Sequence, residues 1–328
     1  MKRRQFLTFA AATIAAPSII SRPSYGADQK TVVFHLKNVT NPFYKNVRDG
    51  AEAAAKEFGI KIEIAAPTKP DNIEEQIRLV EDWIVKKPDG MVFVPVDYKA
   101  MAPSAQKIKD AKIPLVIYNN IIPQLADSTP FLGLDDVEIG YRISTEVFKA
   151  LGGKGKVIHI DGVPGAITAQ DRKAGMERAL KENPGIELLA SQPGNYRRLS
   201  AVQVFENLMQ RFPQIDGVVA ANDDMAVGVV ESALAAGRTN IKVVGCDCIP
   251  DAIGLIKAGK QFGSIDTAPF NQGYLSMRAM IEMLKGAAVP KKIMLPLTFV
   301  TKQNVDTWLK PPAERPRPDW NAVLKSNA

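Results

Sequence analysis

Short apolar runs alternate with helical stretches from Thr31 almost to the end of this 328-residue chain. The first run, TVVFHL, leads into an alanine-rich helical stretch that ends near Phe58, and the same alternation then recurs. Runs such as MVFVPV are apolar at every position, which is typical of parallel strands buried on both faces. The alternation therefore predicts parallel sheets covered by helices on both faces. We expect the later helices over 72–86, 101–111, 167–182, 199–212, 225–236, 251–259 and 271–286.

The alternation divides into two halves of similar layout. At roughly 100–200 residues per domain, a chain of this length is expected to form two units. Two doubly wound lobes, each with its own parallel sheet, fit this repetition better than one large sheet. The fold class predicted from the sequence is therefore α/β with two lobes.

The first 26 residues have the layout of an export signal, with a basic start, a short apolar run and then small residues. The paired Arg3 and Arg4 stand in the segment RRQFL, which resembles the twin-arginine (Tat) address R-R-x-F-L. Small residues at Ser24 and Gly26 favour cleavage after Gly26. The apolar run falls short of the roughly 20 residues that span a bilayer. We expect a Tat-type export signal over 1–26.

Charge argues against a nucleic-acid partner. The formal net charge is +7, and the leader contributes four basic residues and no acidic one, which leaves +3 for the remainder. A net charge of +3 is too small to indicate a surface that binds nucleic acid.

Groups suited to catalysis or metal binding are few. Cys246 and Cys248 lie two apart in IKVVGCDC, where a strand would point both to one face, a poor geometry for a disulfide between them. We expect both to be small buried residues. His35 and His159 lie inside predicted strands, where packing is favoured over general base catalysis. No nucleophile elbow or phosphate-binding loop is present. We therefore expect no enzyme, no metal site and no cofactor.

Polar residues stand where many of the predicted strands end. Ligands of open α/β sheets bind beyond the carboxyl ends of the strands, and amide and carboxylate groups suit a ligand with many hydroxyls. Asn and Asp also cap helices and form turns, so either interpretation stays open for any one of them. For Asp223 and Asp224, a helix cap and a first-turn acid are favoured over paired catalytic carboxylates. The strand-end residues are Asn38–Asn41, Asn119, Asn120, Asp161, Asn222, Asp223, Asp247, Asp266 and Thr267.

The segment TNPFY at Thr40–Tyr44 resembles the start of the ribose-type periplasmic sugar-binding proteins, members of the type I periplasmic binding protein fold. The likeness continues through LLASQP at 188–193, AANDDMAVG at 220–228 and VVGCDCIPD at 243–251. These four motifs occur in the family's order and spacing between about Val32 and Gly286. LacI-type repressors share the same lobes but begin with a DNA-binding helix-turn-helix. This chain begins with an export signal instead, so a repressor is not expected.

The resemblance implies two lobes joined by three crossovers, with closure around the ligand by hinge bending. We map the first lobe to 30–133 plus 268–296 and the second lobe to 134–267 plus 297–328. Aromatic rings would stack on the apolar face of a sugar, and charged side chains would bond its hydroxyls. Pairing of Arg172 with Asp247 would also offset the cost of burying both charges. The residues that we assign to the ligand are Asn41, Phe43, Tyr44, Asn119, Asn120, Arg172, Tyr196, Asn222, Asp247 and Thr267.

Three departures from the family pattern concern specificity. Ribose binders have Asp-Arg where this chain has Asn119-Asn120, Asn where it has Val94, and Gln where it has Thr267. These changes remove charged side chains and long polar side chains from the first lobe. A site built to bond particular hydroxyls is sensitive to such changes. We therefore expect a neutral ligand other than ribose, such as a polyol, a deoxysugar or a different pentose.

The family resemblance also implies the partners and the location. We expect a periplasmic, monomeric solute-binding protein that delivers a small carbohydrate or polyol to a membrane ABC permease. A sensory co-receptor that docks on a histidine kinase or chemoreceptor is the alternative, and the sequence of the binding lobes does not separate the two.

Overall fold

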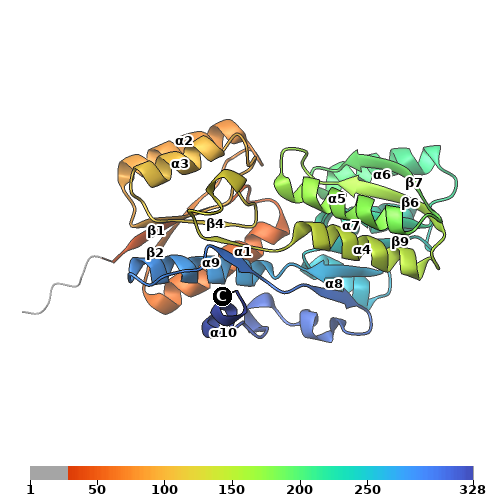
Figure 1. The fold of residues 1–328 in the computed structure, drawn as a ribbon. Helices are drawn as coiled ribbons and strands as arrows, with labels where there is room; N and C mark the ends of the chain where they lie inside the picture. Colours follow the sequence, from red (N-terminus) through yellow and green to blue (C-terminus); the bar gives the residue numbers. More distant parts are fainter. Residues whose placement is uncertain (1–28, 328) are drawn as a thin grey trace, which may run out of the picture.

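The computed structural model describes residues 29–327, so the export signal expected over 1–26 lies outside the described residues. Two lobes stand side by side in Figure 1, each built on its own six-stranded sheet. This arrangement confirms the α/β fold with two doubly wound lobes. Within residues 29–327, no helix combines the length and the apolar character needed to cross a bilayer.

The first sheet has the strand order β11-β5-β4-β3-β1-β2, and all of its neighbouring strands are parallel. Strands β1, β3 and β4 lie inside the sheet and are almost completely buried, which explains their continuous apolar sequence. The strands are β1 (Thr31–His35), β2 (Lys61–Ala65), β3 (Gly90–Phe93), β4 (Leu115–Tyr118), β5 (Phe131–Gly133) and β11 (Lys292–Met294).

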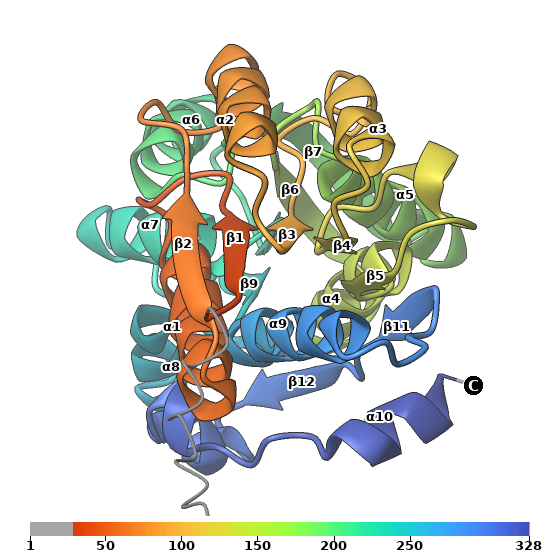
Figure 2. The same ribbon diagram turned by 90° about the vertical axis from the view of Figure 1, so that its left-hand side faces the viewer.

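Helices cover both faces of the first sheet: α2 and α3 lie on one side, and α1 and α9 on the other (Figure 2). Helix α1 packs closely against α9 because Gly50 and Gly273 each leave room for the backbone of the other helix. The elements are α1 (Pro42–Phe58), α2 (Ile73–Lys86), α3 (Ala102–Asp110), η1 (Pro123–Leu125) and α9 (Pro269–Leu284).

The second sheet has the order β12-β10-β9-β8-β6-β7 and is parallel except for its edge strand β12, which runs antiparallel to β10. Helix α4 packs against α5, and α6 packs against α7. The strands are β6 (Gly155–Asp161), β7 (Ile186–Pro193), β8 (Gly217–Ala220), β9 (Lys242–Cys246), β10 (Gly263–Asp266) and β12 (Thr298–Thr301). The helices are α4 (Asp136–Ala150), α5 (Ile167–Glu182), α6 (Arg198–Arg211), α7 (Asp223–Ala235) and α8 (Pro250–Lys257).

The chain passes between the two sheets three times, after β5, after β10 and after β11. The last crossing leads into β12 and then into a tail with η2 (Val305–Leu309), η3 (Pro312–Glu314) and α10 (Trp320–Ser326). The tail, which we assigned to the second lobe from the sequence, also contacts the first sheet, because Asn327 exchanges hydrogen bonds with the backbone of Met294 in β11. The lobe boundaries at 133/134, 267/268 and 296/297 stay a prediction.

Candidate functional site

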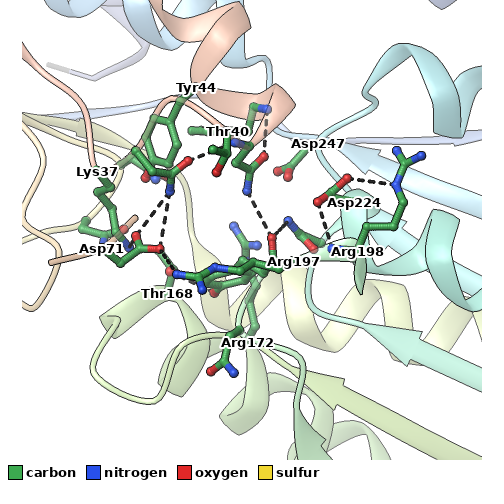
Figure 3. A pocket seen from close by; sticks show the side chains of 18 of the residues that line it. Lys37, Thr40, Tyr44, Asp71, Thr168, Arg172, Arg197, Arg198, Asp224 and Asp247 are labelled. Atoms are coloured by element: carbon green, nitrogen blue, oxygen red, sulfur yellow. Dashed lines mark hydrogen bonds and ion pairs between the residues drawn. The ribbon is translucent and has the colours of Figure 1, made fainter. Parts of the chain in front are cut away.

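A cavity of about 260 Å³ lies between the lobes, where the carboxyl ends of strands from both sheets face each other. Side chains from both lobes surround it in Figure 3, with Lys37, Tyr44 and Asp71 on one side and Arg172, Asp224 and Asp247 from the other lobe. The lining residues are Lys37, Asn38, Thr40, Asn41, Phe43, Tyr44, Asp71, Asn119, Asn120, Thr168, Arg172, Asn195, Tyr196, Arg197, Arg198, Leu199, Asn222, Asp224 and Asp247.

The start of α1 brings three of the predicted residues to the cavity. Asn41 is the N-cap of this helix, and its side-chain oxygen accepts a hydrogen bond from the backbone N–H of Phe43 at 2.9 Å. Its amide nitrogen also reaches across the cleft to the carbonyl oxygen of Tyr196, at 3.4 Å. The rings of Phe43 and Tyr44 meet edge to face with centroids 5.0 Å apart, and both line the cavity. Asn41 therefore acts as a helix cap and also touches the opposite lobe.

Asn119 and Asn120 follow β4 and also line the cavity. Asn119 adopts a left-handed backbone conformation with φ 58°, which asparagine tolerates better than most residues. Asn120 is fully buried, and its amide nitrogen donates to the carbonyl oxygen of Pro95 at 3.0 Å. The first lobe thus holds Asn120 by its own backbone.

Arg172 projects from α5 and is 5 % exposed. Its Nε lies 2.8 Å from Oδ1 of Asp136, and Nη1 donates to the carbonyl oxygen of Ala221 at 2.6 Å. The expected pairing of Arg172 with Asp247 is wrong, because Asp136 at the start of α4 supplies the counter-charge. Burial raises the pKa of Asp136 to about 6, and the nearby guanidinium opposes that rise. Sequence reasoning missed Asp136 because it stands in the first turn of a helix, where an acid needs no functional explanation.

Asp247 follows β9 in a strained backbone conformation, with φ 120°. Its Oδ1 accepts a hydrogen bond from Oγ1 of Thr267 at 2.9 Å. Burial raises the pKa of Asp247 to about 8, and the positive charge of Arg172 opposes this rise. Thr267 is completely buried and does not line the cavity, so the structure places it behind Asp247, which it orients.

Tyr196 lines the cavity from the segment between β7 and α6, and its hydroxyl lies 3.1 Å from Oγ1 of Thr168. Its ring packs on Gly162, where any Cβ would collide with it. Asn222 is the N-cap of α7, and its side-chain oxygen accepts from the backbone N–H of Met225 at 3.1 Å. Asn222 therefore both caps α7 and lines the cavity.

The remaining candidates are separate from the cavity or engaged elsewhere. His35 and His159 are buried in β1 and β6, and burial lowers the pKa of each to about 3, so both are neutral packed residues. Asp223 accepts hydrogen bonds from Ser264 and Gln261, so it diverges from its neighbour in sequence, as expected. Asp224 pairs with Arg198 at 3.2 Å.

The two cysteines are buried and free, in agreement with the sequence-based expectation. Within residues 29–327, no group of three or more His, Cys, Asp or Glu side chains is placed to hold a metal ion.

Sequence reasoning missed two charged residues of the first lobe that line the cavity. Lys37 directly follows the run TVVFHL, two residues after β1 ends, and its position at a strand end was the available signal. Asp71 stands in the loop before α2 and carries no sequence signal. A backbone hydrogen bond of 3.1 Å, donated by Asp71 to the carbonyl of Lys37, joins the two segments.

Comparison with known proteins gives consistent results. A family model for the periplasmic binding protein domain matches residues 32–288. The chain is 30% identical over 282 residues to the D-allose-binding periplasmic protein of Escherichia coli K12, which covers 83% of this chain and 89% of that protein.

Two solved structures show the same similarity in three dimensions. An ABC transporter periplasmic solute-binding protein from Actinobacillus succinogenes 130z with bound D-allose matches with a TM-score of 0.80 at 30% identity, over 84% of this chain and 99% of that chain. A twin-arginine translocation pathway signal protein from Burkholderia phytofirmans matches with a TM-score of 0.81 at 30% identity, over 90% of this chain and 97% of that chain.

Proposed function

This chain belongs to the periplasmic binding protein family, and from that premise we propose that it captures a small neutral carbohydrate or polyol between its lobes and delivers it to an ABC permease. The family consists of solute-binding proteins rather than enzymes. Binding and release of an unchanged ligand is therefore the activity that we propose, with no cofactor.

The observation that carries this proposal is the composition of the cavity between the lobes. At about 260 Å³ it falls just below the 300–1,000 Å³ of pockets for drug-sized ligands, which suits a smaller molecule. Amide, carboxylate and guanidinium groups from both lobes face it, together with the rings of Phe43, Tyr44 and Tyr196. Rings can cover the apolar C–H face of a sugar while the polar groups bond its hydroxyls.

We assign the ligand contacts to nine of the ten residues chosen from the sequence, all of which line the cavity. Thr267 is proposed as a positioning residue that acts through Asp247. The nine are Asn41, Phe43, Tyr44, Asn119, Asn120, Arg172, Tyr196, Asn222 and Asp247.

The proposed location is the periplasm, and the proposed partner is a membrane ABC permease. The RRQFL segment supports export through the twin-arginine pathway, and the similarity to the Burkholderia phytofirmans protein is consistent with it. We propose that the mature protein is a periplasmic monomer that docks on the permease in its ligand-bound form. A deletion strain that loses uptake of the ligand would support delivery, whereas normal uptake with a lost transcriptional or swimming response would support sensing instead.

A thermal-shift screen of the mature protein against sugars, polyols, amino acids and amines tests the ligand class. A ligand that binds only the folded state adds about 2.7 kcal/mol of stability at a hundredfold excess over its dissociation constant. We expect a shift with a carbohydrate or polyol that is lost in Asp247→Ala and Arg172→Ala. A shift with amines or amino acids alone contradicts the proposed ligand class.

A further inference from the structure

The crossing that leads from β10 into α9 is held by a short run of hydrogen bonds between buried groups. Oγ1 of Thr267 donates to Oδ1 of Asp247 at 2.9 Å, and the carbonyl oxygen of Thr267 accepts from Nε2 of Gln272 at 2.8 Å. Thr267 and Gln272 are both completely buried. Asp247 lines the cavity from the second lobe, whereas Gln272 lies near the start of α9, which covers the first sheet. The run therefore connects a helix of the first lobe to a cavity carboxyl group of the second.

Gln272 uses only part of its hydrogen-bonding capacity. Its Oε1 is buried and has no hydrogen-bond partner among residues 29–327. A buried amide oxygen without a partner lowers stability, and an apolar side chain of similar length would avoid that cost. The favourable contribution of this side chain is therefore the bond that it donates to Thr267.

The residue after Thr267 adopts a strained backbone conformation. Ala268 has φ 48° and ψ 53°, in the left-handed region that costs energy for a residue with a Cβ. Its N–H donates to Oδ1 of Asp266 at 2.8 Å, and its carbonyl oxygen accepts from the backbone N–H of Gln272 at 2.9 Å. Hinge motion changes φ and ψ at a few residues of the crossings. Such a change at Ala268 moves Thr267 relative to Gln272.

We infer that Gln272 is a positioning residue, which acts through Thr267 to hold the carboxyl group of Asp247 in the orientation that bonds the ligand. This inference rests on the proposed function and adds a residue that does not itself line the cavity. Rotation of the lobes about this crossing stretches or breaks the bonds on either side of Thr267, and Asp247 then loses its orientation. Ligand affinity is in this way coupled to the hinge.

The test is a double-mutant cycle of Gln272→Met and Thr267→Val, measured by isothermal titration with D-allose, D-ribose, xylitol and myo-inositol as probes. We expect each single variant to weaken the tightest-binding probe about 2- to 10-fold, the range for loss of one neutral hydrogen bond. The double variant should bind no more weakly than Thr267→Val alone, because both changes act through the same contact with Asp247. A general loss of stability would not produce this coupling.

Gln261→Met is the matched control. Gln261 is a second buried glutamine whose Oε1 has no partner within residues 29–327. Its Nε2 donates to Oδ1 of Asp223 and to the carbonyl oxygen of Gly263, both at 3.2 Å, and neither of these residues lines the cavity. This variant should bind the probe within twofold of wild type.

Gln272→Leu takes the place of Gln272→Met if the latter does not fold. Affinity of the Gln272 variant within twofold of wild type overturns the inference and leaves the proposed function in place. A loss that adds fully to that of Thr267→Val, or an equal loss in Gln261→Met, does the same. If no carbohydrate or polyol binds wild type, the proposed function fails and the inference fails with it.

A second, independent observation concerns the tail, residues 302–327, which we call the C-terminal strap. Its first part is fixed to the second lobe. Asp306 pairs with Lys257 of α8 at 2.6 Å, and Nε1 of Trp308 donates to Oδ2 of Asp266 at 2.9 Å. In Figure 2 the strap then runs beneath α9 towards β11, where α10 lies.

The far end of the strap is fixed to the first lobe. Arg317 lies 3.3 Å from Oε2 of Glu57 in α1, and its guanidinium lies 4.7 Å from the ring centroid of Tyr274 in α9. Asn327 exchanges hydrogen bonds with both backbone groups of Met294. The strap therefore ties the lobes together in addition to the three covalent crossings.

The segment between the two anchors, residues 310–316, is short and rich in proline. Pro311, Pro312 and Pro316 each fix φ, which makes the segment a semi-rigid spacer. Rotation that moves α8 relative to α1 changes the distance between the anchors. The segment follows such a change only if an anchor is released or its own turns unfold.

We propose that the C-terminal strap restrains rotation of the lobes and so raises ligand affinity. With the strap released, the ligand-free molecule populates arrangements of the lobes that do not bind the ligand. The apparent dissociation constant then rises as the binding-competent fraction falls.

Insertion of Gly-Ser-Gly-Ser between Ala313 and Glu314 lengthens the strap and leaves both anchors in place, and Arg317→Ala weakens the first-lobe anchor. We expect both variants to increase the ligand-free radius of gyration in small-angle scattering, to leave the ligand-saturated radius unchanged and to weaken affinity about 2- to 10-fold. The same insertion between Thr239 and Asn240, in the exposed loop between α7 and β9, is the control and should change neither quantity.

An unchanged ligand-free radius in the strap insertion overturns this proposal, as does an equal increase in the control insertion. The ligand-free radius is measured without any probe, so this result does not depend on the proposed function.

Discussion

The two walls of the cavity differ in how far their buried charged groups are already hydrogen-bonded. On the second-lobe wall, Arg172 is bonded to Asp136 and Ala221, and Asp247 to Thr267. On the first-lobe wall, Lys37 has no side-chain hydrogen bond within residues 29–327. A group that its own lobe already orients loses little freedom when a ligand binds. The second lobe therefore holds its buried charged groups as a fixed frame, whereas the ammonium of Lys37 in the first lobe is left without a side-chain hydrogen bond within residues 29–327.

The strongest test of the fixed frame is Arg172→Met, which leaves the carboxylate of Asp136 buried without its partner. Breaking a buried ion pair costs about 3–5 kcal/mol, so we expect a loss of unfolding free energy in that range and loss of ligand binding. Urea denaturation measures it. Arg178→Met, on the exposed face of the same helix, breaks a surface pair with Glu182 and a contact with the ring of Tyr141, and it should cost much less stability because exposed charges are screened by water. Equal losses in the two variants would contradict the fixed frame.

The raised pKa of Asp247 predicts that the stability of the protein depends on pH. Its folded pKa of about 8 lies above the ordinary 3.8, so the folded protein holds a proton that the unfolded chain releases between these values. The contribution of Asp247 to the free energy of unfolding of the ligand-free protein should therefore fall as pH rises from about 4 to about 8.

Asp247→Asn should reduce this slope and also weaken ligand binding by about 0.5–1.5 kcal/mol, because a hydrogen bond between the ligand and the neutral carboxyl group is lost. Asp136 and Asp223, with pKa values raised to about 6 and about 7, remain in both proteins and give slopes of the same sign. Denaturation of both proteins at pH 5 and pH 8 measures the difference. A variant with the wild-type slope would show that Asp247 is ionised in the folded protein.

Two asparagine caps in the first lobe allow a matched comparison. Asn41 caps α1 and reaches the second lobe, whereas Asn72 caps α2, its side-chain oxygen accepting from the backbone N–H of Glu75 at 2.8 Å, and does not line the cavity. Replacing either by alanine should cost about 1 kcal/mol of stability. Only Asn41→Ala should also weaken the ligand, measured by titration calorimetry. Equal affinities would show that Asn41 acts only as a cap.

The smallest effect is expected at Arg197, which is 49 % exposed and lies 3.6 Å from Asp71 across the cleft. Arg197→Ala should change ligand affinity by less than about 1 kcal/mol, and 0.5 M salt should remove the difference because exposed charges are screened. Stopped-flow release at two salt concentrations measures it. An effect that salt leaves intact would assign Arg197 to the ligand itself.

Much of the fold could be predicted from local pattern. The observed helices α2, α3, α5, α6, α7, α8 and α9 begin and end within two residues of the expected ranges, and the resemblance to ribose-type periplasmic binding proteins is confirmed. Nine of the ten expected site residues line one cavity, since strand ends of parallel sheets converge at the same edge. The antiparallel edge strand β12 and the return of the tail to the first lobe carry no local signal.

The sequence by itself determined the periodic alternation, the two lobes and the motifs that bring Asn41, Arg172 and Asp247 to the cleft, because these follow from neighbouring residues and chain order. Only the tertiary structure decided the partners of those groups: Asp136 for Arg172, Thr267 for Asp247, and Asp71 beside Lys37. The physical reason is that a buried charge takes whichever group the packing of distant segments places within a few ångströms, and sequence spacing does not encode that distance.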